Sequence, residues 1–547
     1  MEFTGPYPTK FSGHTNAMLI SATAFSGGVT NAGTIGPGGG VIITSSTFLT
    51  GGFVNTNLIS GTANGISVLS DSTIAGAIVD SGTIRATKDG ILVSGGVVSS
   101  GIQVGSQGKI SAGSSGIVVE NTITFAGGIN NAGSIFASRA GIDLSTVAVF
   151  GGGSTSGGIT NRGTISAGHA GIDLTSVGTF FGGIVNSGTG KIVASDGGID
   201  VTTVTVFGAG STAGGITNAG TISAGHAGVE LTSVGTFLGS VLNVGTTVAE
   251  TGFTILDSTI QGALVDSGTI RAASAGIEVN SAAVIVGGRQ VSSKGKIIAL
   301  PLTSSGTGVA GIAVRNTTSF GGGITNSGTI SAQAAAILAF NVSTFAGGIT
   351  NSGTLGESVV LVQLSSFTGG IGNSGKINSP FAGIRLNSVG TFAGGISNSK
   401  VGTIIAKSGD GIVVGTTSGT PATVSSFSGG ITNSGTISGG HSNAGVFVDN
   451  ASLFAGGIVN NSGGRIAAGS NGIQIKLVTT FTGGISNSGT ITAKSHGIVV
   501  SSVAMFGSGG PGGGITNIGT ISVSSAAQSR FPPTLAASPA ASATAAS

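Results

Sequence analysis

The sequence contains no cysteine, no tryptophan and a single tyrosine among its 547 residues. Without cysteine the chain forms neither disulfides nor a cysteine-based zinc cluster, which fits an oxidising and a reducing compartment equally well. Charged residues make up only 7%, and the formal net charge is +3. Because no run of lysine or arginine is interleaved with aromatic residues, nucleic acid is not an expected partner.

Long apolar runs are also missing. No stretch of about 18 apolar residues occurs, so we expect no transmembrane helix in this chain. The first 24 residues lack the basic start and apolar run of a secretion signal. The printed sequence therefore shows no export signal.

What the chain does contain is glycine, phenylalanine and repetition. It has 106 glycines and 25 phenylalanines, and a mean hydropathy of +0.48, which is too apolar for a disordered chain. One unit is 481–500, FTGGISNSGTITAKSHGIVV. Its pattern, Phe-x-Gly-Gly-Ile-x-Asn-x-Gly-x-Ile followed by Gly-Ile-x-Val or Gly-Ile-x-Leu, recurs through most of the chain. A period of tens of residues indicates a stacked repeat architecture.

Within a unit the apolar residues alternate with polar ones, as Ile491 does between Thr490 and Thr492. This is the period of a β-strand. Short strands of this kind bury a core only by lying on the next unit. The sequence therefore predicts an all-β fold, a right-handed parallel β-helix (β-solenoid) that forms a single elongated repeat domain, with glycine at the sharp corners.

Stacking would align equivalent residues of successive units in ladders. Phenylalanine rings would stack on one another, and asparagine amides would bond up and down the stack. The predicted ladder residues are Asn326, Asn351, Asn373, Asn398, Asn433, Asn460 and Asn487, with Phe320, Phe345, Phe367, Phe392, Phe427, Phe454 and Phe481. Their role is expected to be structural.

The pattern divides the chain into three segments. Residues 1–24 are an N-terminal lead-in or irregular cap, 25–525 the solenoid, and 526–547 a disordered tail rich in proline, alanine and serine. The stretches 71–86 and 257–272 are nearly identical, which indicates duplication of a block of units. In both stretches aspartate, Asp80 or Asp266, stands where asparagine is usual. Three units carry inserted residues after the phenylalanine, at 151–156, 208–213 and 507–512.

Strings such as GGITNSGTISG at 429–439 and GGITNSGTISA at 322–332 resemble the passenger regions of bacterial autotransporters, the type V secreted surface proteins. The resemblance covers nearly the whole repeat region. It implies a β-helix displayed at the cell surface or outside the cell. A long, weakly charged face of Thr, Ser and Asn side chains suits a structural or adhesive role through many shallow polar contacts with host surfaces, glycans or sibling cells. The resemblance also implies an outer-membrane barrel, which is expected here only if it is encoded outside this sequence.

The few acids follow the repeat. Asp143, Asp173, Asp200 and Glu230 occupy one outward position in successive units, with Glu278 at the equivalent place later. In register they would form a column with roughly 4.8 Å between neighbours. One hypothesis is a cation-binding stripe of the calcium type. The alternative, which we favour, is a solvated outer face whose charge is partly compensated by Arg139, His169 and His226.

Catalytic constellations are not apparent. The histidines never pair at metal-ligand spacing, and a column of equivalent acids lacks the two different environments that glycoside hydrolysis needs. We therefore expect no enzyme activity, no metal and no cofactor. Two other functions are kept as alternatives: a carbohydrate-active β-helix enzyme, either a polysaccharide lyase or a hydrolase, and an ice-binding-like hydroxyl face. That face would hold Thr164 and Ser166, Thr221 and Ser223, Thr329 and Ser331, Thr436 and Ser438, and Thr490 and Thr492.

Overall fold

The computed structural model describes residues 18–45, 47–152, 157–209, 214–281, 284–300, 309–415, 424–507 and 513–524. In this part of the chain every regular element is a β-strand. The strands stack in parallel as a β-solenoid of about 18 turns, which confirms the predicted fold class. Most of the lead-in, the tail and most of the inserted residues of the three longer units lie outside the described residues.

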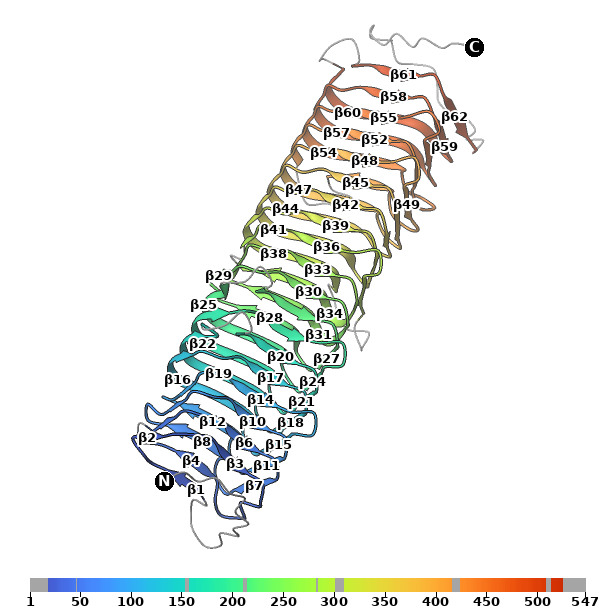
Figure 1. The fold of residues 1–547 in the computed structure, drawn as a ribbon. Helices are drawn as coiled ribbons and strands as arrows, with labels where there is room; N and C mark the ends of the chain where they lie inside the picture. The colour runs from blue at the N-terminus through green and yellow to red at the C-terminus, as the bar shows by residue number, and fades with distance from the viewer. Residues whose placement is uncertain are drawn as a thin grey trace, which may run out of the picture. The chain divides into compact units, whose positions relative to one another are not determined.

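Internal contacts divide the chain into two compact units, 1–273 (unit 1) and 274–547 (unit 2). Both are built from the same turn, and in each unit successive turns lie one beside the next (Figure 1). A typical turn contains β20 (Ile159–Asn161), β21 (Thr164–Ala167) and β22 (Ile172–Phe181). We call these the Asn strand, the Thr strand and the long strand.

The strands of unit 1 follow this order. Its Asn strands are β3 (Val29–Asn31), β6 (Phe53–Asn55), β10 (Ile78–Asp80), β14 (Ile102–Val104), β17 (Ile129–Asn131), β20, β23 (Ile184–Asn186), β26 (Ile216–Asn218), β30 (Val241–Asn243) and β33 (Leu264–Asp266). Its Thr strands include β15 (Lys109–Ala112), β18 (Ser134–Ala137), β21, β24 (Lys191–Ala194) and β27 (Thr221–Ala224). Its long strands include β16 (Ile117–Phe125), β19 (Ile142–Phe150), β22, β25 (Ile199–Ala209) and β28 (Ala227–Thr232).

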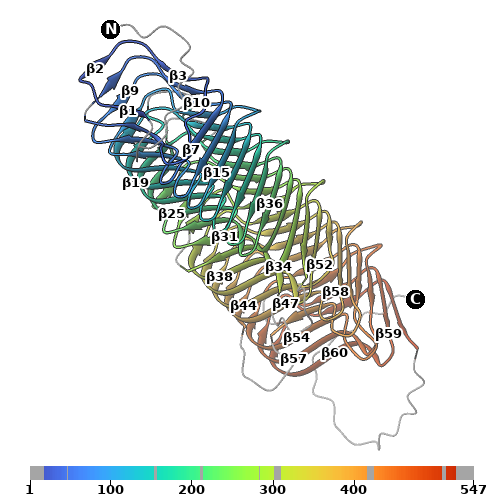
Figure 2. The same ribbon diagram turned by 90° about the horizontal axis from the view of Figure 1, so that it is seen from below.

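Unit 2 repeats the same three columns, which Figure 2 shows from a second side. Its Asn strands are β36 (Arg289–Val291), β39 (Ile324–Asn326), β42 (Ile349–Asn351), β45 (Ile371–Asn373), β48 (Ile396–Asn398), β52 (Ile431–Asn433), β55 (Ile458–Asn460), β58 (Ile485–Asn487) and β61 (Ile515–Asn517). Its Thr strands are β37 (Lys296–Ala299), β40 (Thr329–Ala332), β43 (Thr354–Leu355), β46 (Lys376–Ser379), β49 (Thr403–Ala406), β53 (Thr436–Ser438), β56 (Arg465–Ala467), β59 (Thr490–Ala493) and β62 (Thr520–Val523). Its long strands include β38 (Ala310–Phe320), β41 (Ala335–Phe345), β44 (Val359–Phe367), β47 (Ile384–Phe392), β54 (Val446–Phe454), β57 (Asn471–Phe481) and β60 (His496–Phe506).

Side chains alternate between the inside and the outside of each turn. In β21 the inward Ile165 and Ala167 are buried, whereas the outward Thr164 and Ser166 are half-buried. Ile165 lies in register with Ile192 of β24, so each turn covers the apolar side chains of its neighbour. The core therefore exists only because turns stack, as the sequence predicts.

A bend divides the long strands, and its corner residue is usually polar rather than glycine, although it is Leu477 in β57. Thr146 of β19, Ser176 of β22 and Asn341 of β41 have φ values of 54°, 58° and 53°. These angles lie in the left-handed region, which side chains other than glycine adopt at a cost and which asparagine tolerates best. Glycine does occupy the corner after the phenylalanine, where Gly182 has a φ of 80°. The predicted use of glycine at corners with positive φ therefore holds after the phenylalanine but does not extend to the bend inside the long strand.

The phenylalanines that open the repeat stack as separate columns in the two units. In unit 1 the ring centroids of neighbours lie 4.7 to 5.1 Å apart, and in unit 2 they lie 4.5 to 5.0 Å apart. The unit 1 column contains Phe125, Phe150, Phe180, Phe207 and Phe237, and the unit 2 column contains Phe320, Phe345, Phe367, Phe392, Phe427, Phe454, Phe481 and Phe506. Each ring thus fills the gap above the ring of the previous turn.

The asparagine amides form a directional ladder. In unit 2 the Nδ2 of Asn326 donates to the Oδ1 of Asn351 at 2.8 Å, and the same bond links every following pair. The later members are Asn373, Asn398, Asn433, Asn460, Asn487 and Asn517. Every donor belongs to the earlier turn, so each asparagine needs an acceptor in the turn that follows. Apart from that of Asn517, these amides are buried, where an unpaired donor costs about 1–3 kcal/mol.

The aspartate at the asparagine position ends a ladder. Asp80 accepts from Asn55 at 2.7 Å, and the next turn has Val104 at this position, which offers no acceptor. An ionised carboxylate needs no acceptor, so aspartate completes the ladder where asparagine would leave a buried donor unpaired. The following ladder begins with Asn131, whose Oδ1 accepts from the backbone N–H of Gly133 at 3.2 Å. Aspartate at the usual asparagine position, as at Asp80, therefore marks the end of a ladder.

Candidate functional site

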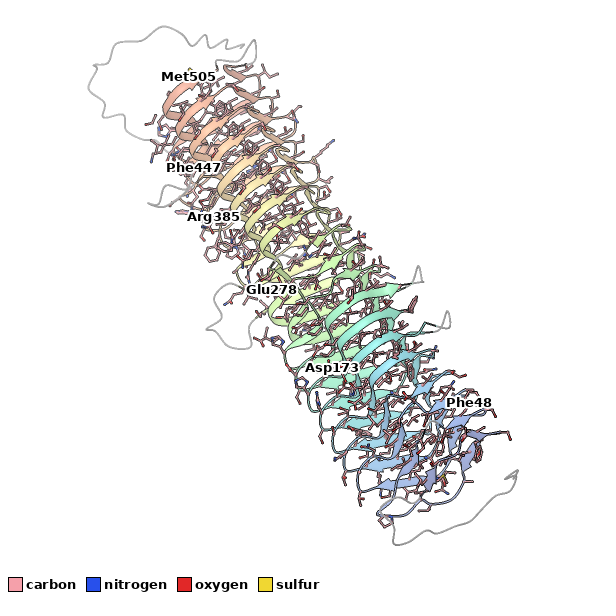
Figure 3. The ribbon with its side chains drawn as sticks, turned by 90° about the vertical axis from the view of Figure 1, so that its left-hand side faces the viewer. Phe48, Asp173, Glu278, Arg385, Phe447 and Met505 are labelled. Atoms are coloured by element: carbon pink, nitrogen blue, oxygen red, sulfur yellow. The ribbon has the colours of Figure 1, made fainter. Side chains whose placement is uncertain are left out.

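The structure places four of the acids in one column on unit 1. Asp143 of β19 lies in register with Asp173 of β22, Asp173 with Asp200 of β25, and Asp200 with Glu230 of β28. Adjacent members are separated by one strand spacing, roughly 4.8 Å. Figure 3 labels Asp173 in this column. Glu278 belongs to unit 2, where it pairs with Arg315 at 3.2 Å.

A second column runs beside the acids on the link that precedes the long strands. It holds Arg139, His169, Asp196 and His226, each four residues before its acid. Backbone hydrogen bonds connect these residues, with the N–H of each donating to the carbonyl of the previous one at 2.9 to 3.1 Å. Sequence reasoning found the three basic members but missed Asp196. The spacing of four between Asp196 and Asp200 is the signal that would have found it.

The ion pairs differ from the expected pattern, in which each base neutralises the acid of its own turn. His226 follows that pattern, since its Nδ1 lies 3.5 Å from Glu230. His169 instead contacts Asp196 of the next turn, with 3.0 Å between Nε2 and Oδ2. As a result the turn of β25 presents two carboxyl groups, those of Asp196 and Asp200, and neither of its two column positions holds a cation.

Asp143 corrects the expectation of a solvated face, because it is only 6% exposed. Its register neighbours in the adjacent turns are Val118 and Asp173. Ser115 Oγ lies 3.5 Å from its Oδ2. Burial, with a smaller contribution from Asp173, raises the pKa of Asp143 to about 6. An outward-facing position in the acidic column is therefore not always exposed to solvent.

Asp200 is held differently from its neighbour in the column. Asp173 accepts a hydrogen bond from the hydroxyl of Thr175 at 2.9 Å. Asp200 also has a threonine two residues later, yet its Oδ1 is shielded from solvent and has no hydrogen-bond partner among the described residues. Its carboxyl group folds back over Gly197, where the Cβ of any other residue would collide with it. Alanine occupies the equivalent position at Ala170.

This environment changes the protonation of Asp200. Burial is the main cause that raises its pKa to about 8, and the charges of Glu230, Asp173 and Asp196 add to it. Asp200 therefore holds its proton at neutral pH. The expectation that all acids of the column are equivalent is wrong, because the turn without a cation makes Asp200 distinct.

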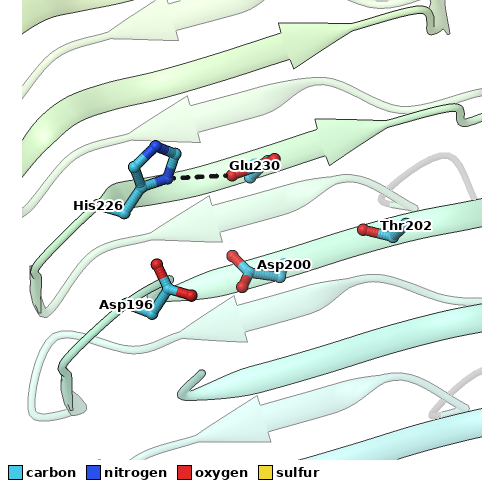
Figure 4. Close-up of a pocket in the computed structure, with 5 residues that line it drawn as sticks. All are labelled: Asp196, Asp200, Thr202, His226 and Glu230. Atoms are coloured by element: carbon cyan, nitrogen blue, oxygen red, sulfur yellow. Dashed lines mark ion pairs between the residues drawn. The ribbon is translucent and has the colours of Figure 1, made fainter. Parts of the chain in front are cut away.

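An open hollow of about 280 Å³ lies at this place, lined by Asp196, Asp200, Thr202, His226 and Glu230 (Figure 4). The hollow combines a protonated carboxyl group, a carboxyl paired with an imidazole, and a hydroxyl. These groups can donate protons and hydrogen bonds to a polar ligand. Among the residues that the structure describes, no group of three or more acids and histidines is placed to hold a metal ion. The calcium stripe therefore gains no geometric support.

The Thr strands carry the second candidate surface, but not as an uninterrupted hydroxyl array. In unit 1, Lys191 lies in register between Thr164 and Thr221. In unit 2 one outward column contains Thr329, Thr354, Lys376, Thr403, Thr436, Arg465 and Thr490, all in register. Long cationic side chains thus interrupt the flat hydroxyl surface that ice binding would require. We call this unit 2 column the Thr face.

In the described part of the chain no helix is long and apolar enough to span a membrane. No protein-family model matches the sequence, and neither the curated proteins nor the solved structures contain a match. The resemblance to autotransporter passengers thus stays a prediction from the repeat motif.

Proposed function

We propose that this protein is an adhesive β-solenoid displayed at the cell surface or released outside the cell, similar to the passenger of a bacterial autotransporter. The observation that carries the proposal is the Thr face of unit 2, a column of hydroxyl and cationic side chains in register over consecutive turns. The repeat motif supports the autotransporter type. Association with the outer membrane, through a barrel encoded outside this sequence, is part of the same proposal.

The Thr face suits many weak contacts with a polar polymer. A single exposed hydrogen bond contributes little, but contacts repeated at each turn act together once the first has formed. Lys376 and Arg465 are exposed and separated by the threonines of the turns between them. Their charge attracts acidic groups, and it is screened by salt. The expected ligand class is therefore an acidic glycan of a host or sibling-cell surface.

Binding of the purified chain to heparin beads and to neutral dextran beads tests this function. We expect salt-sensitive retention on heparin that weakens in the variant Lys376→Thr/Arg465→Thr, which keeps the threonine pattern of the face. The matched control Lys88→Thr/Arg162→Thr removes the same charge from exposed sites of unit 1. Equal weakening in both variants would show that net charge alone is responsible. No retention on either polymer or on bacterial or host cells would reject adhesion.

The hollow on unit 1 favours a second candidate function, a carbohydrate-active enzyme of the hydrolase type. Retaining glycosidases use a protonated acid and a second carboxylate about 5 Å apart, and one strand spacing is roughly 4.8 Å. Asp200 holds a proton at neutral pH, and Glu230 lies one strand away. Polysaccharide cleavage that is lost in Asp200→Asn and in Glu230→Gln, but kept in the control Asp143→Asn, would establish this function. Absence of cleavage across acidic and neutral polysaccharides would reject it.

A further inference from the structure

The last described turn of unit 2 has strands that are paired on one side only. Among the described residues, β60 pairs with β57, β61 with β58, and β62 with β59. Their outer edges carry backbone N–H and C=O groups that face away from the unit. An open edge of this kind is a template for another strand. We call the outer edges of β60, β61 and β62, with the side chains of this turn, the C-terminal face.

The C-terminal face is apolar as well as unpaired. Ile515 and Ile521 are 43% and 37% exposed, although their register partners Ile485 and Ile491 in the previous turn are buried. These are inward positions of the repeat, so what is exposed here is the cross-section of a core. Solenoids that remain monomeric usually cover such an end with a polar capping repeat.

The first described turn of unit 1 differs. Its inward side chains are less exposed: Ile20, Asn31 and Ile35 are buried, and Met18, Phe25 and Val29 are half-buried. A head-to-tail contact would need both ends to be open, because each interface joins the end of one copy to the start of the next. Among the described residues, the C-terminal face is therefore the more exposed of the two core sections.

We propose that the C-terminal face of unit 2 is an interface between two copies of this chain, paired through the same face on each copy. Such an isologous contact closes as a dimer and does not grow into a filament. A two-fold axis across the face sets the facing edges antiparallel, an orientation in which both strands exchange hydrogen bonds. His496 is the only titratable side chain of β60, β61 and β62, so little charge on these strands opposes the pairing.

Two further observations favour a second copy as the occupant. Asn517 ends the amide ladder: it accepts from Asn487 at 2.6 Å, while its Nδ2 has no acceptor among the described residues. A second copy offers backbone carbonyls at this edge. The sequence 525–547 contains no glycine, asparagine, isoleucine or valine, and its prolines lack the N–H that a strand must donate. It therefore does not carry the repeat that would add a further turn.

The oligomeric state of the full chain tests the proposal. Sedimentation equilibrium is expected to show a concentration-dependent rise to twice the chain mass of 51.9 kDa, with no larger species. The variant Ile515→Lys/Val523→Lys places charge on the face and is expected to raise the dimer dissociation constant about tenfold or more. The control Ile123→Lys/Val401→Lys alters exposed residues away from the face, 83% and 75% exposed, and is expected to leave the constant unchanged.

Spin labels in the otherwise native chain keep the test independent of how the lysine variants fold. Because the chain has no cysteine, Ser522→Cys and Thr30→Cys each give one label site, on β62 and β3. We expect a short intermolecular distance for the label at position 522 and none for the label at position 30. A short distance between positions 522 and 30 in mixed samples would mean head-to-tail stacking. That result, a chain that stays monomeric at all concentrations, or amide protection of the β60 edge in a monomer would overturn the proposal.

Discussion

Replacing Arg289 by isoleucine should make unit 2 more stable. Arg289 opens β36, is 2% exposed, and lies in the inward column where the next turns have Ile324 and Ile349. None of its guanidinium nitrogens has a hydrogen-bond partner within the described residues. Its guanidinium carbon lies 4.6 Å from the centroid of the Phe320 ring, a cation–π contact that offsets part of the lost solvation.

The pKa and the ring contact set the size of the effect. Burial lowers the pKa of Arg289 to about 9. Each pKa unit corresponds to about 1.4 kcal/mol, so the fall from an ordinary value of about 12.5 represents about 5 kcal/mol against the charged form. A desolvated cation–π contact returns about 2 kcal/mol. Arg289→Ile removes both contributions, and we expect the free energy of unfolding to rise by about 2–4 kcal/mol.

The direction of the pKa shift of Arg289 also determines how its destabilising effect depends on pH. The folded-state pKa lies below the unfolded one, so the destabilisation is fully present below about pH 9 and is relieved as pH rises further. The advantage of Arg289→Ile over the native chain should therefore be constant at neutral pH and shrink in strong alkali.

Urea unfolding followed by circular dichroism, with hydrogen exchange of the β39 amides as a local probe, measures the gain. Arg289→Lys, which keeps a charge but loses the planar stacking on Phe320, should be less stable than the native chain. Arg162→Ile, a change at an exposed arginine, should lie within about 0.5 kcal/mol of it. An Arg289→Ile variant less stable than the native chain would refute the reasoning, because it would mean that the buried guanidinium is a net stabiliser.

Three further predictions concern the carboxyl groups of unit 1 and the pH dependence of stability. Asp80→Asn alone leaves a buried Nδ2 facing Val104, whereas Asp80→Asn/Val104→Asn joins two ladders. The double-mutant cycle in urea should therefore show a favourable coupling of about 1–3 kcal/mol, and a coupling near zero would contradict the role of Asp80 as a ladder end. Gly197→Ala puts a methyl group where the Asp200 carboxyl lies, so the pKa of Asp200 should fall towards its ordinary range in an NMR titration; a value still near 8 would count against the packing described. Buried carboxyl groups with raised pKa values hold protons that the unfolded chain releases, so stability is fully present below about pH 4 and is lost as pH rises towards 8. The midpoint of thermal unfolding should accordingly be higher at pH 5 than at pH 8, and the opposite order would be inconsistent with these shifts.

Periodicity in the sequence carries the fold because each unit repeats the same strands. The alternation around Ile491 gives the strand period, and the regular return of asparagine after Gly-Gly-Ile gives the register between turns. Once the register is known, the alignment of Asp143 with Asp173 follows without any knowledge of loops. These features depend on spacing along the chain, which a sequence displays directly.

Contacts between turns are less accessible, because they depend on which side chain lies above which. The pair of His169 with Asp196 joins residues of different units, and only the stacked structure shows that it leaves Asp200 without a cation. The left-handed corner at Thr146 was missed for another reason: its residue type varies from turn to turn, so no single letter marks it. The burial of Arg289 also depends on a register that places a charged residue in an isoleucine column.

Departures from the repeat carry more information about function than the repeat itself. In a regular turn each group is satisfied by its copy in the next turn, as the Nδ2 of Asn326 is by Asn351. A single substitution in one turn therefore leaves a polar or charged group that has no matching partner in the neighbouring turn. Asp80 removes the need for an acceptor beyond the ladder, although its buried Oδ2 has no hydrogen-bond partner among the described residues. In contrast, Asp196, an acid in a column of bases, leaves Asp200 protonated beside an open hollow. A ligand that exchanges protons or hydrogen bonds with Asp200 would supply the partner that the turn of β25 lacks. The hollow is therefore the first place on unit 1 to test for ligand binding or catalysis.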